Sequence, residues 1–237
     1  STITRTASGG TDDWTEAGLD TSIEHRFFTG SASHTLLAGI DLRRAERDYR
    51  WGFNFSAPSI NWRNPVYGVD PATLPLKDRV SDTNTVAKQA GIYVSDRVEI
   101  DRLILSGGLR FDWFETELRN NQTGTTSTFR DTAVTGHVGA LYTFDNGVAP
   151  YISYSTSFEP VNETPPPGLA TFDPSEGKQF ELGLKWASPD DSIFVQAAVF
   201  DITQTGVLQY NRALRGFEQV GKIESRGFEL ETRAEIN

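Results

Sequence analysis

The stretch LILSGGLRFDWF, residues 103–114, decides the fold. Leucine, glycine, phenylalanine and tryptophan occupy its odd-numbered positions, whereas the even-numbered positions include Ser106, Arg110 and Asp112. A period of two is typical of a β-strand, because successive side chains of a strand point to opposite faces of the sheet. We therefore predict a strand over 103–114 with one apolar face and one polar face.

The same alternation recurs along the chain and predicts about ten strands. It is clear in 179–186 and 227–234, and weaker in 14–28, 34–49, 84–98, 132–144 and 148–158, with a remnant at 2–6. Segment 192–203 has large apolar residues at both parities, so its two faces stay unassigned. Most of these strands exceed the ~5–6 residues that are usual in soluble sheets.

The connections between the expected strands alternate in length. Tight turns are predicted near 29–33, 98–102, 145–147 and 187–191, and long polar connections at 7–13, 50–83, 118–131, 159–175 and 204–216. Asn146-Gly147 indicates a two-residue hairpin turn, because both residue types accept positive φ. In an up-and-down meander, this alternation places all the short turns at one end and all the long connections at the other.

Composition narrows the function classes. The 237 residues carry a formal net charge of −10 and no cysteine. The negative charge disfavours nucleic acid as a partner, and none is expected. The absence of cysteine excludes disulfides and thiol nucleophiles within these residues. No apolar run approaches the ~18 residues of a transmembrane helix. A mean hydropathy of −0.41 is compatible with membrane strands, which alternate lipid-facing and lumen-facing residues.

Two architectures fit the alternation: a soluble β-sandwich, meander or propeller, and a membrane β-barrel. Three features favour the barrel. The strands can supply the ~9–11 residues that cross a bilayer, the long and short connections segregate, and aromatic residues gather near strand ends. These aromatic residues are Phe27, Phe28, Trp113, Tyr142, Phe144 and Trp186. We therefore expect an all-β, antiparallel, up-and-down transmembrane β-barrel, since a sheet in lipid must close to leave no edge.

Five ordered strings resemble the barrel of TonB-dependent siderophore receptors, most closely the ferric-hydroxamate branch. They are AGIYVSDRVE (90–99), LSGGLRFDW (105–113), DNGVAPYISYSTSFEP (145–160), GKQFELGLKW (177–186) and GKIESRGFELE (221–231). Such receptors have a 22-stranded barrel filled by an N-terminal plug. Neither a plug nor a TonB-contacting box is recognised in this sequence. The resemblance thus implies that residues 1–237 are a barrel fragment, about ten of 22 strands, with the plug and terminal strands outside it.

Signals of catalysis are weak. The three histidines, His25, His34 and His137, lack the spacing of metal ligands, and no phosphate-binding loop or nucleophile elbow occurs. Carboxylates such as Asp112, Glu181 and Glu229 alternate with apolar residues, as expected of charges that face the lumen. We predict no enzyme activity, no catalytic residue, no metal site and no cofactor, with ferric iron entering only as part of a siderophore ligand.

The richest candidate for ligand recognition is the predicted long connection 50–83. Aromatic residues gather in and just before it: Tyr49, Trp51, Phe53, Phe55, Trp62 and Tyr67. Such rings offer a large contact area at low entropic cost and could grip a ferric chelate on the extracellular side. They could equally only pack the connection on itself or on the plug. The near balance of charge in 50–83 favours a near-neutral hydroxamate chelate over a strongly anionic catecholate complex.

The resemblance implies a receptor in the outer membrane of a Gram-negative bacterium that takes up ferric siderophores. Its expected partners are the siderophore, outer-membrane lipid and the TonB–ExbB–ExbD complex, the last reached through the plug and box. Two alternatives stay open: a passive porin-like outer-membrane channel, and a soluble β-rich binding module.

Overall fold

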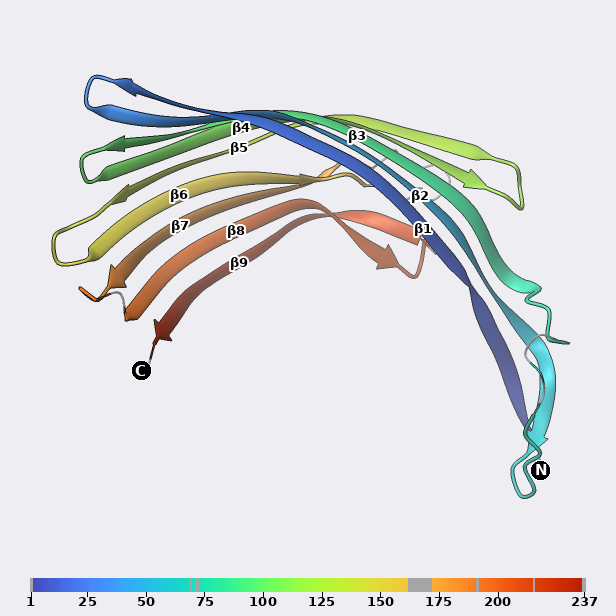
Figure 1. Ribbon diagram of the computed structural model, residues 1–237. Coiled ribbons are helices and arrows are strands. Elements are labelled where there is room, and N and C mark those ends of the chain that lie inside the picture. The colour runs from blue at the N-terminus through green and yellow to red at the C-terminus, as the bar shows by residue number, and fades with distance from the viewer. Residues whose placement is uncertain are drawn as a thin grey trace. The chain divides into compact units, whose positions relative to one another are not determined.

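The computed structural model describes residues 2–68, 70, 73–161, 172–190, 192–214 and 216–235. In these residues the chain forms nine strands (Figure 1). Their bounds are β1 (Thr2–Thr29), β2 (Ala32–Asn61), β3 (Asp78–Ile100), β4 (Leu103–Asn120), β5 (Thr126–Tyr142), β6 (Val148–Glu159), β7 (Ser175–Ala187), β8 (Ile193–Asn211) and β9 (Gly216–Ala234). The described residues contain no helix with the length and apolar character needed to span a membrane.

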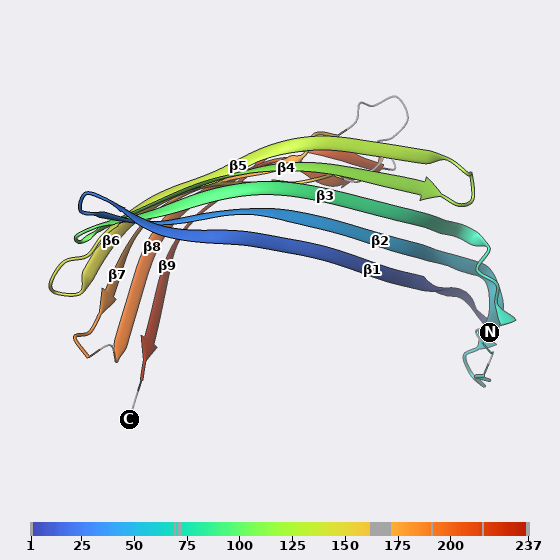
Figure 2. The same cartoon turned by 45° about the horizontal axis from the view of Figure 1, so that its top comes forward.

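The strands pair in chain order, β1-β2-β3-β4-β5-β6-β7-β8-β9, as in a meander. The pairs β5–β6, β6–β7, β7–β8 and β8–β9 are antiparallel. Strands β6 to β9 lie side by side in both views of the ribbon (Figure 1 and Figure 2). The predicted all-β, antiparallel, up-and-down arrangement is confirmed. The chain divides into a first unit (Ser1–Gly18, Arg43–Lys88 and Glu115–Phe129) and a second unit (Leu19–Leu42, Gln89–Phe114 and Arg130–Asn237).

Strand register aligns the apolar positions of the second unit into rows. Ile152 pairs with Leu182, Leu182 with Val199, and Val199 with Phe228. Partners in a ladder project to the same side of a sheet, so these residues define an apolar face. The register also assigns the ambiguous strand β8: Val199 belongs to the apolar face and Phe200 to the opposite, polar face.

The apolar face of the second unit is open. Leu109, Leu182 and Leu230 are 63%, 50% and 64% exposed. Among the described residues, the buried hydrophobic side chains are all alanines: Ala45, Ala133, Ala149 and Ala198. A soluble sandwich would cover such a face with a second layer of protein, and the described residues of this unit provide none.

Several segments that were predicted to be connections are strands in the structure. The described residues therefore form nine strands and not the predicted number of about ten. Residues 7–13 lie within β1, so the remnant at 2–6 is not a separate strand. β2 continues to Asn61 and β3 begins at Asp78, so most of 50–61 is strand. Likewise β4 and β5 shorten the expected 118–131 connection, and β8 and β9 shorten that at 204–216. Most of the expected 159–175 connection lies outside the described residues.

The four predicted tight turns occur where expected, and one has a different geometry. At 143–147 the Phe144 N–H donates to the Val148 carbonyl at 2.8 Å, and the Gly147 N–H donates to the Phe144 carbonyl at 3.1 Å. Gly147 has a φ of 79°, whereas Asn146 is not among the residues with positive φ. The expected two-residue hairpin turn is therefore wrong: the connection is longer, and the glycine alone supplies the left-handed conformation.

Candidate functional site

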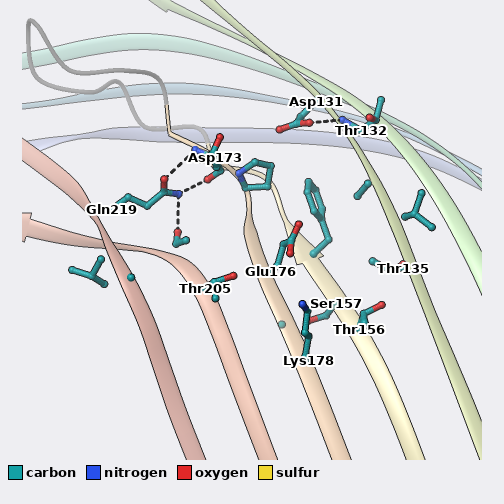
Figure 3. Close-up of a pocket in the computed structure, with 18 residues that line it drawn as sticks. Asp131, Thr132, Thr135, Thr156, Ser157, Asp173, Glu176, Lys178, Thr205 and Gln219 are labelled. Carbon is teal, nitrogen blue, oxygen red and sulfur yellow. Dashed lines mark hydrogen bonds between the residues drawn. The ribbon is translucent and has the colours of Figure 1, made fainter.

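A hollow of about 730 Å³ opens in the second unit, at the end of β5 to β9 opposite the short turns (Figure 3). We call it the strand-end hollow. Its lining comes from β5, β6, β7, β8, β9 and the residues just before β7: Asp131, Thr132, Ala133, Val134, Thr135, Thr156, Ser157, Phe158, Asp173, Pro174, Glu176, Gly177, Lys178, Thr205, Gly206, Gln219, Val220 and Gly221.

The hollow begins where β5 and β6 part. These strands pair from Leu141↔Tyr151 to His137↔Ser155. At the next position, the Thr156 hydroxyl accepts a hydrogen bond from the Gly136 N–H at 2.9 Å, so a side chain takes the place of a ladder bond. The strand ends beyond this point flank the hollow.

One glutamine fixes the base of the hollow. The Gln219 amide donates from Nε2 to the Gly206 carbonyl at 3.0 Å and to the Asp173 carbonyl, and its Oε1 accepts from the Asp173 N–H at 3.1 Å (Figure 3). Gly206 has a φ of 68°, and a Cβ there would lie 2.5 Å from the Pro174 carbonyl oxygen. A glycine is therefore required where residues 173–174 approach β8.

The charges around the hollow are mostly negative. Asp131 comes from β5, whereas Asp173 and Glu176 lie at or just before the start of β7, and Lys178 is the cation among the lining residues (Figure 3). Glu176 and Lys178 have the same parity as Leu182, so they project to the apolar side of β7. Asp131 Oδ1 accepts from the Thr132 N–H at 2.7 Å. Hydroxyl groups of Thr132, Thr135, Thr156, Ser157 and Thr205 complete a polar lining. Such a lining suits recognition of a ligand by hydrogen bonds and charge.

The polar face of the second unit carries two further networks. Arg110 donates to Asp112 through Nε at 2.7 Å and Nη2 at 2.6 Å, and to Asp41 at 3.0 Å. Gln89 donates to Asp112 Oδ1 at 2.9 Å, so the network ties β2, β3 and β4 together. Asp112 is 5% exposed, and a buried carboxylate of this kind requires such partners.

The second network centres on Tyr151. Its hydroxyl donates to Glu181 Oε1 at 2.5 Å and accepts from Gln196 Nε2 at 3.1 Å. The ring lies over Gly183, where a Cβ would come within 2.4 Å of it. This arrangement links β6, β7 and β8 on the polar face.

The aromatic residues predicted as the ligand site all belong to the first unit, and most do not lie in a loop. Tyr49 is on β2, as expected of a residue just before the connection. Trp51, Phe53 and Phe55 are also on β2, which corrects the expectation of a loop, whereas Trp62 and Tyr67 lie in the connection to β3. The four strand residues occupy alternate positions, so they share one face of β2. The expected strand ended at residue 49, whereas β2 continues to Asn61.

Several of these rings already have neighbours. The Phe53 and Phe55 centroids are 5.7 Å apart. Arginine guanidinium carbons lie 4.9 Å from the Tyr49 ring centroid, 5.3 Å from that of Phe55 and 5.1 Å from that of Trp62. The arginines are Arg47, Arg79 and Arg63. Trp51 and Tyr67 are 40% and 77% exposed.

The sequence did not indicate the strand-end hollow. Asp131, the neighbouring Asp173 and Glu176, and Gln219 come from three distant parts of the chain, and the three carboxylates fell in predicted connections or at their borders. Only strand register brings them together, and no local pattern of one sequence encodes it.

Comparison with known proteins identifies the family of the chain. The family model described as TonB dependent receptor-like, beta-barrel, matches residues 1–237. The sequence is 37% identical over 225 residues to the ferrichrome outer membrane transporter/phage receptor of Escherichia coli K12, covering 92% of this chain and 30% of that protein. It is 32% identical over 235 residues to the ferrioxamine B receptor of Salmonella typhimurium LT2, covering 99% of this chain and 33% of that protein. The chain thus spans about a third of the length of these relatives.

Solved structures share the fold. The ferric-catecholate import receptor Fiu of E. coli K12 matches with a TM-score of 0.73 and 22% identity, covering 96% of this chain and 36% of that chain. The siderophore receptor PiuA of Acinetobacter baumannii matches with a TM-score of 0.74 and 22% identity, covering 96% of this chain and 37% of that chain. At these identities the likeness concerns the fold alone.

Proposed function

The chain belongs to the TonB-dependent receptor-like β-barrel family, and from this premise we propose that the whole protein takes up ferric siderophores across the outer membrane of a Gram-negative bacterium. The short turns face the periplasm and the opposite strand ends face the cell exterior. The apolar face of the second unit contacts lipid hydrocarbon, because lipid, unlike water, does not penalise exposed leucine and phenylalanine.

The observation that carries the proposal is the family match over the full chain, joined by relatives whose names specify ferrichrome and ferrioxamine B. Both are ferric hydroxamate chelates, so hydroxamate siderophores are the favoured substrate class. The strand-end hollow supports a recognition role, since its volume of about 730 Å³ lies within the ~300–1,000 Å³ common for small-molecule sites.

The proposed partners follow from this function. The TonB–ExbB–ExbD complex supplies energy through a plug domain, outer-membrane lipid surrounds the strands, and the ferric siderophore is the cargo. Ferric iron is therefore substrate and not a resident cofactor, and we assign the chain no catalytic step. Trp51 and Tyr67, the exposed members of the predicted aromatic set, are the side chains that we propose to contact the chelate.

Radiolabelled iron uptake tests the proposal. The full-length receptor is expressed in an iron-starved Gram-negative host that lacks its own hydroxamate receptors. Ferrichrome and ferrioxamine B labelled with radioactive iron are then supplied at low concentration. We expect uptake that requires both the receptor and TonB. Uptake that persists after deletion of TonB would support the porin-like channel instead.

The soluble-module alternative has its own test. Residues 1–237 expressed alone in buffer should fail to give a monomer that melts cooperatively, because the open apolar face meets water. A detergent-free monomer with a sharp thermal transition would support the soluble module.

A further inference from the structure

We propose that the apolar face of the second unit binds, at its border near the short turns, a phospholipid whose headgroup carries a primary ammonium group. Four residues form this site, and we call them the border cluster: His25, Phe27, His34 and Asp96. The inference rests on the proposed function, which places the apolar face in the bilayer, and it adds a specific lipid to that function.

Asp96 lies on the apolar side of β3. Gly91 belongs to the polar face, because a Cβ there would meet the Arg110 side chain. Even-numbered residues of β3 therefore project to the apolar side, where Ile92 and Val94 are exposed. Asp96 is the next residue of this series, so a carboxylate ends the apolar side of β3 before the turn to β4.

The same reasoning places His34 on the apolar side of β2. A Cβ at Gly39 would meet the Tyr93 ring, which lies on the polar side of β3. Odd-numbered residues in this part of β2 therefore face the polar side. His34 shares the other side with Ile40 and Leu42, both of which are exposed.

This border corresponds to the depth of lipid headgroups. On β5 and β7, Tyr142 and Trp186 end the apolar side toward the same set of short turns. Aromatic residues in such positions mark the interface between hydrocarbon and headgroups in membrane barrels. The border cluster takes the equivalent place on β1, β2 and β3, so its polar groups meet headgroups and not the centre of the bilayer.

His34 fixes one oxygen of Asp96, and stacked rings fix His34. The His34 Nδ1 atom lies 2.7 Å from Asp96 Oδ2, and the imidazole donates because an ionised carboxylate only accepts. The His34 ring stacks on Phe27 with the centroids 4.6 Å apart, and Phe27 stacks on His25 at 5.6 Å. The carboxylate is therefore held in one position without a contact to lipid.

The charge of Asp96 is incompletely compensated. Its Oδ1 atom is shielded from water and has no hydrogen-bond partner among the described residues. Three arginines near the short turns pair with other carboxylates: Arg26 with Glu24, Arg97 with Glu99 and Arg102 with Asp145. A carboxylate at the edge of hydrocarbon is costly unless a cation or further donors stabilise it. The Asp96 side chain is 31% exposed, so a cation from outside the chain can reach it.

A primary ammonium group is the headgroup chemistry that fits. It combines a positive charge with three N–H donors, and charge-assisted hydrogen bonds are stronger than neutral ones. A trimethylammonium group has the charge but no donor, and a glycerol headgroup has donors but no positive charge. The exposed apolar residues of β2 and β3 contact the acyl chains of the same molecule. Phosphatidylethanolamine unites these parts, so we assign the site to this lipid class.

A matched pair of lipids tests the inference. Delipidated full-length receptor in detergent is titrated with phosphatidylethanolamine or with phosphatidylcholine of the same acyl chains, which differs only in the three methyl groups on nitrogen. Native mass spectrometry gives the dissociation constant of the first lipid bound. We expect phosphatidylethanolamine to bind about two- to fivefold more tightly, the range of an exposed ion pair.

Charge variants locate the effect. Asp96→Asn removes the charge with little change of shape and should move the ratio of the two dissociation constants to one. Asp201→Asn is the matched control, because Asp201 lies on the apolar side of β8 toward the opposite strand ends and also has a basic partner, Arg226, at 2.7 Å. This control should keep the wild-type ratio.

Equal binding of the two lipids by the wild-type receptor overturns the inference without any variant. A preference that persists in Asp96→Asn, or that is lost equally in Asp201→Asn, also overturns it. These outcomes leave siderophore uptake intact. A receptor that binds neither lipid would mean that the apolar face does not contact lipid, which overturns the proposed function together with the inference.

Discussion

At the scale of single residues, Gly183 decides whether the Tyr151 network can form. A Cβ at position 183 would lie 2.4 Å from the Tyr151 ring, so any larger residue displaces the ring. Gly183→Val should therefore lower the free energy of unfolding of the full-length receptor by about 2 kcal/mol, through overpacking and loss of the Glu181 and Gln196 hydrogen bonds. Urea unfolding in lipid vesicles measures the loss.

Gly221 provides the matched control for this substitution. A Cβ there would have nothing within 4 Å, and its φ is not positive. Gly221→Val should therefore leave the unfolding free energy close to that of the wild type. Equal losses for the two variants would show that strand propensity, and not the Tyr151 ring, sets the cost at position 183.

Trp51 distinguishes the two hypotheses for the aromatic residues of β2. It is 40% exposed, whereas Phe53 stacks on Phe55 at 5.7 Å. If Trp51 contacts the chelate, Trp51→Ala should raise the dissociation constant for ferrichrome about tenfold, a loss of ~1.4 kcal/mol. Fluorescence titration of the full-length receptor measures it.

Phe53→Ala is the comparison for Trp51. It should lower the thermal midpoint more than it changes chelate affinity, since its ring packs on Phe55. An unchanged dissociation constant in Trp51→Ala would favour the packing hypothesis for the whole set.

At the scale of elements, the turn between β7 and β8 holds an ordered carboxylate. Asp190 Oδ1 accepts from the Ser188 hydroxyl at 2.6 Å and from the Ser192 hydroxyl at 2.9 Å. These hydroxyl donors lower the pKa of Asp190 below its ordinary value. A carboxyl whose folded pKa is depressed stabilises the turn above the unfolded pKa, and this stabilisation disappears as pH falls through the folded pKa.

Carboxyl ¹³C chemical shifts of the labelled full-length protein can follow this titration. We expect Asp190 to titrate below the ~3.9 of an unperturbed aspartate. Replacing both serines, Ser188→Ala and Ser192→Ala, should return the midpoint toward that value. A midpoint in the wild type at or above the unperturbed value would contradict the role of the hydroxyls.

The strands also show how far the sequence predicts the fold. Alternation identified the middle of each strand, where one face is apolar, as in 103–114 and 179–186. It failed in 7–13 because polar and glycine residues at both parities leave no period there. In 50–61 the alternation of Trp51, Phe53 and Phe55 with polar residues and glycine does continue, but the segment was assigned to a connection, whereas β2 extends to Asn61. In β8 alternation did not assign the two faces, because large apolar residues occupy both parities. Phe200 is an example, since it packs over Gly227 on the polar face.

The candidate site was less predictable than the strands. The aromatic residues Trp51 and Tyr67 stand out in a sequence because of their type. The carboxylates of the strand-end hollow are ordinary residues until register gathers them, and a one-residue shift of any strand would turn its side chains to the other face.

At the scale of the whole molecule, the proposed function requires that the apolar face of the second unit contact hydrocarbon. Leu109, Leu182 and Leu230 are exposed residues of that face, and the cysteine-free chain allows single spin labels to be placed there. In the full-length receptor in bilayers, labels at these positions should collide frequently with lipid-dissolved oxygen and rarely with a water-soluble nickel reagent.

Labels on the other face give the internal comparison. Ser155 pairs with Gln179, which places both on the polar face. Spin labels at these two positions should therefore collide less often with lipid-dissolved oxygen than labels on the apolar face. A sheet with hydrocarbon on one side and a polar interior on the other can remain in the bilayer only if its edges are paired, because lipid offers no partners for backbone groups. Shielding of Leu109, Leu182 and Leu230 from oxygen would mean that protein covers the apolar face, and the transport function would then have to be abandoned.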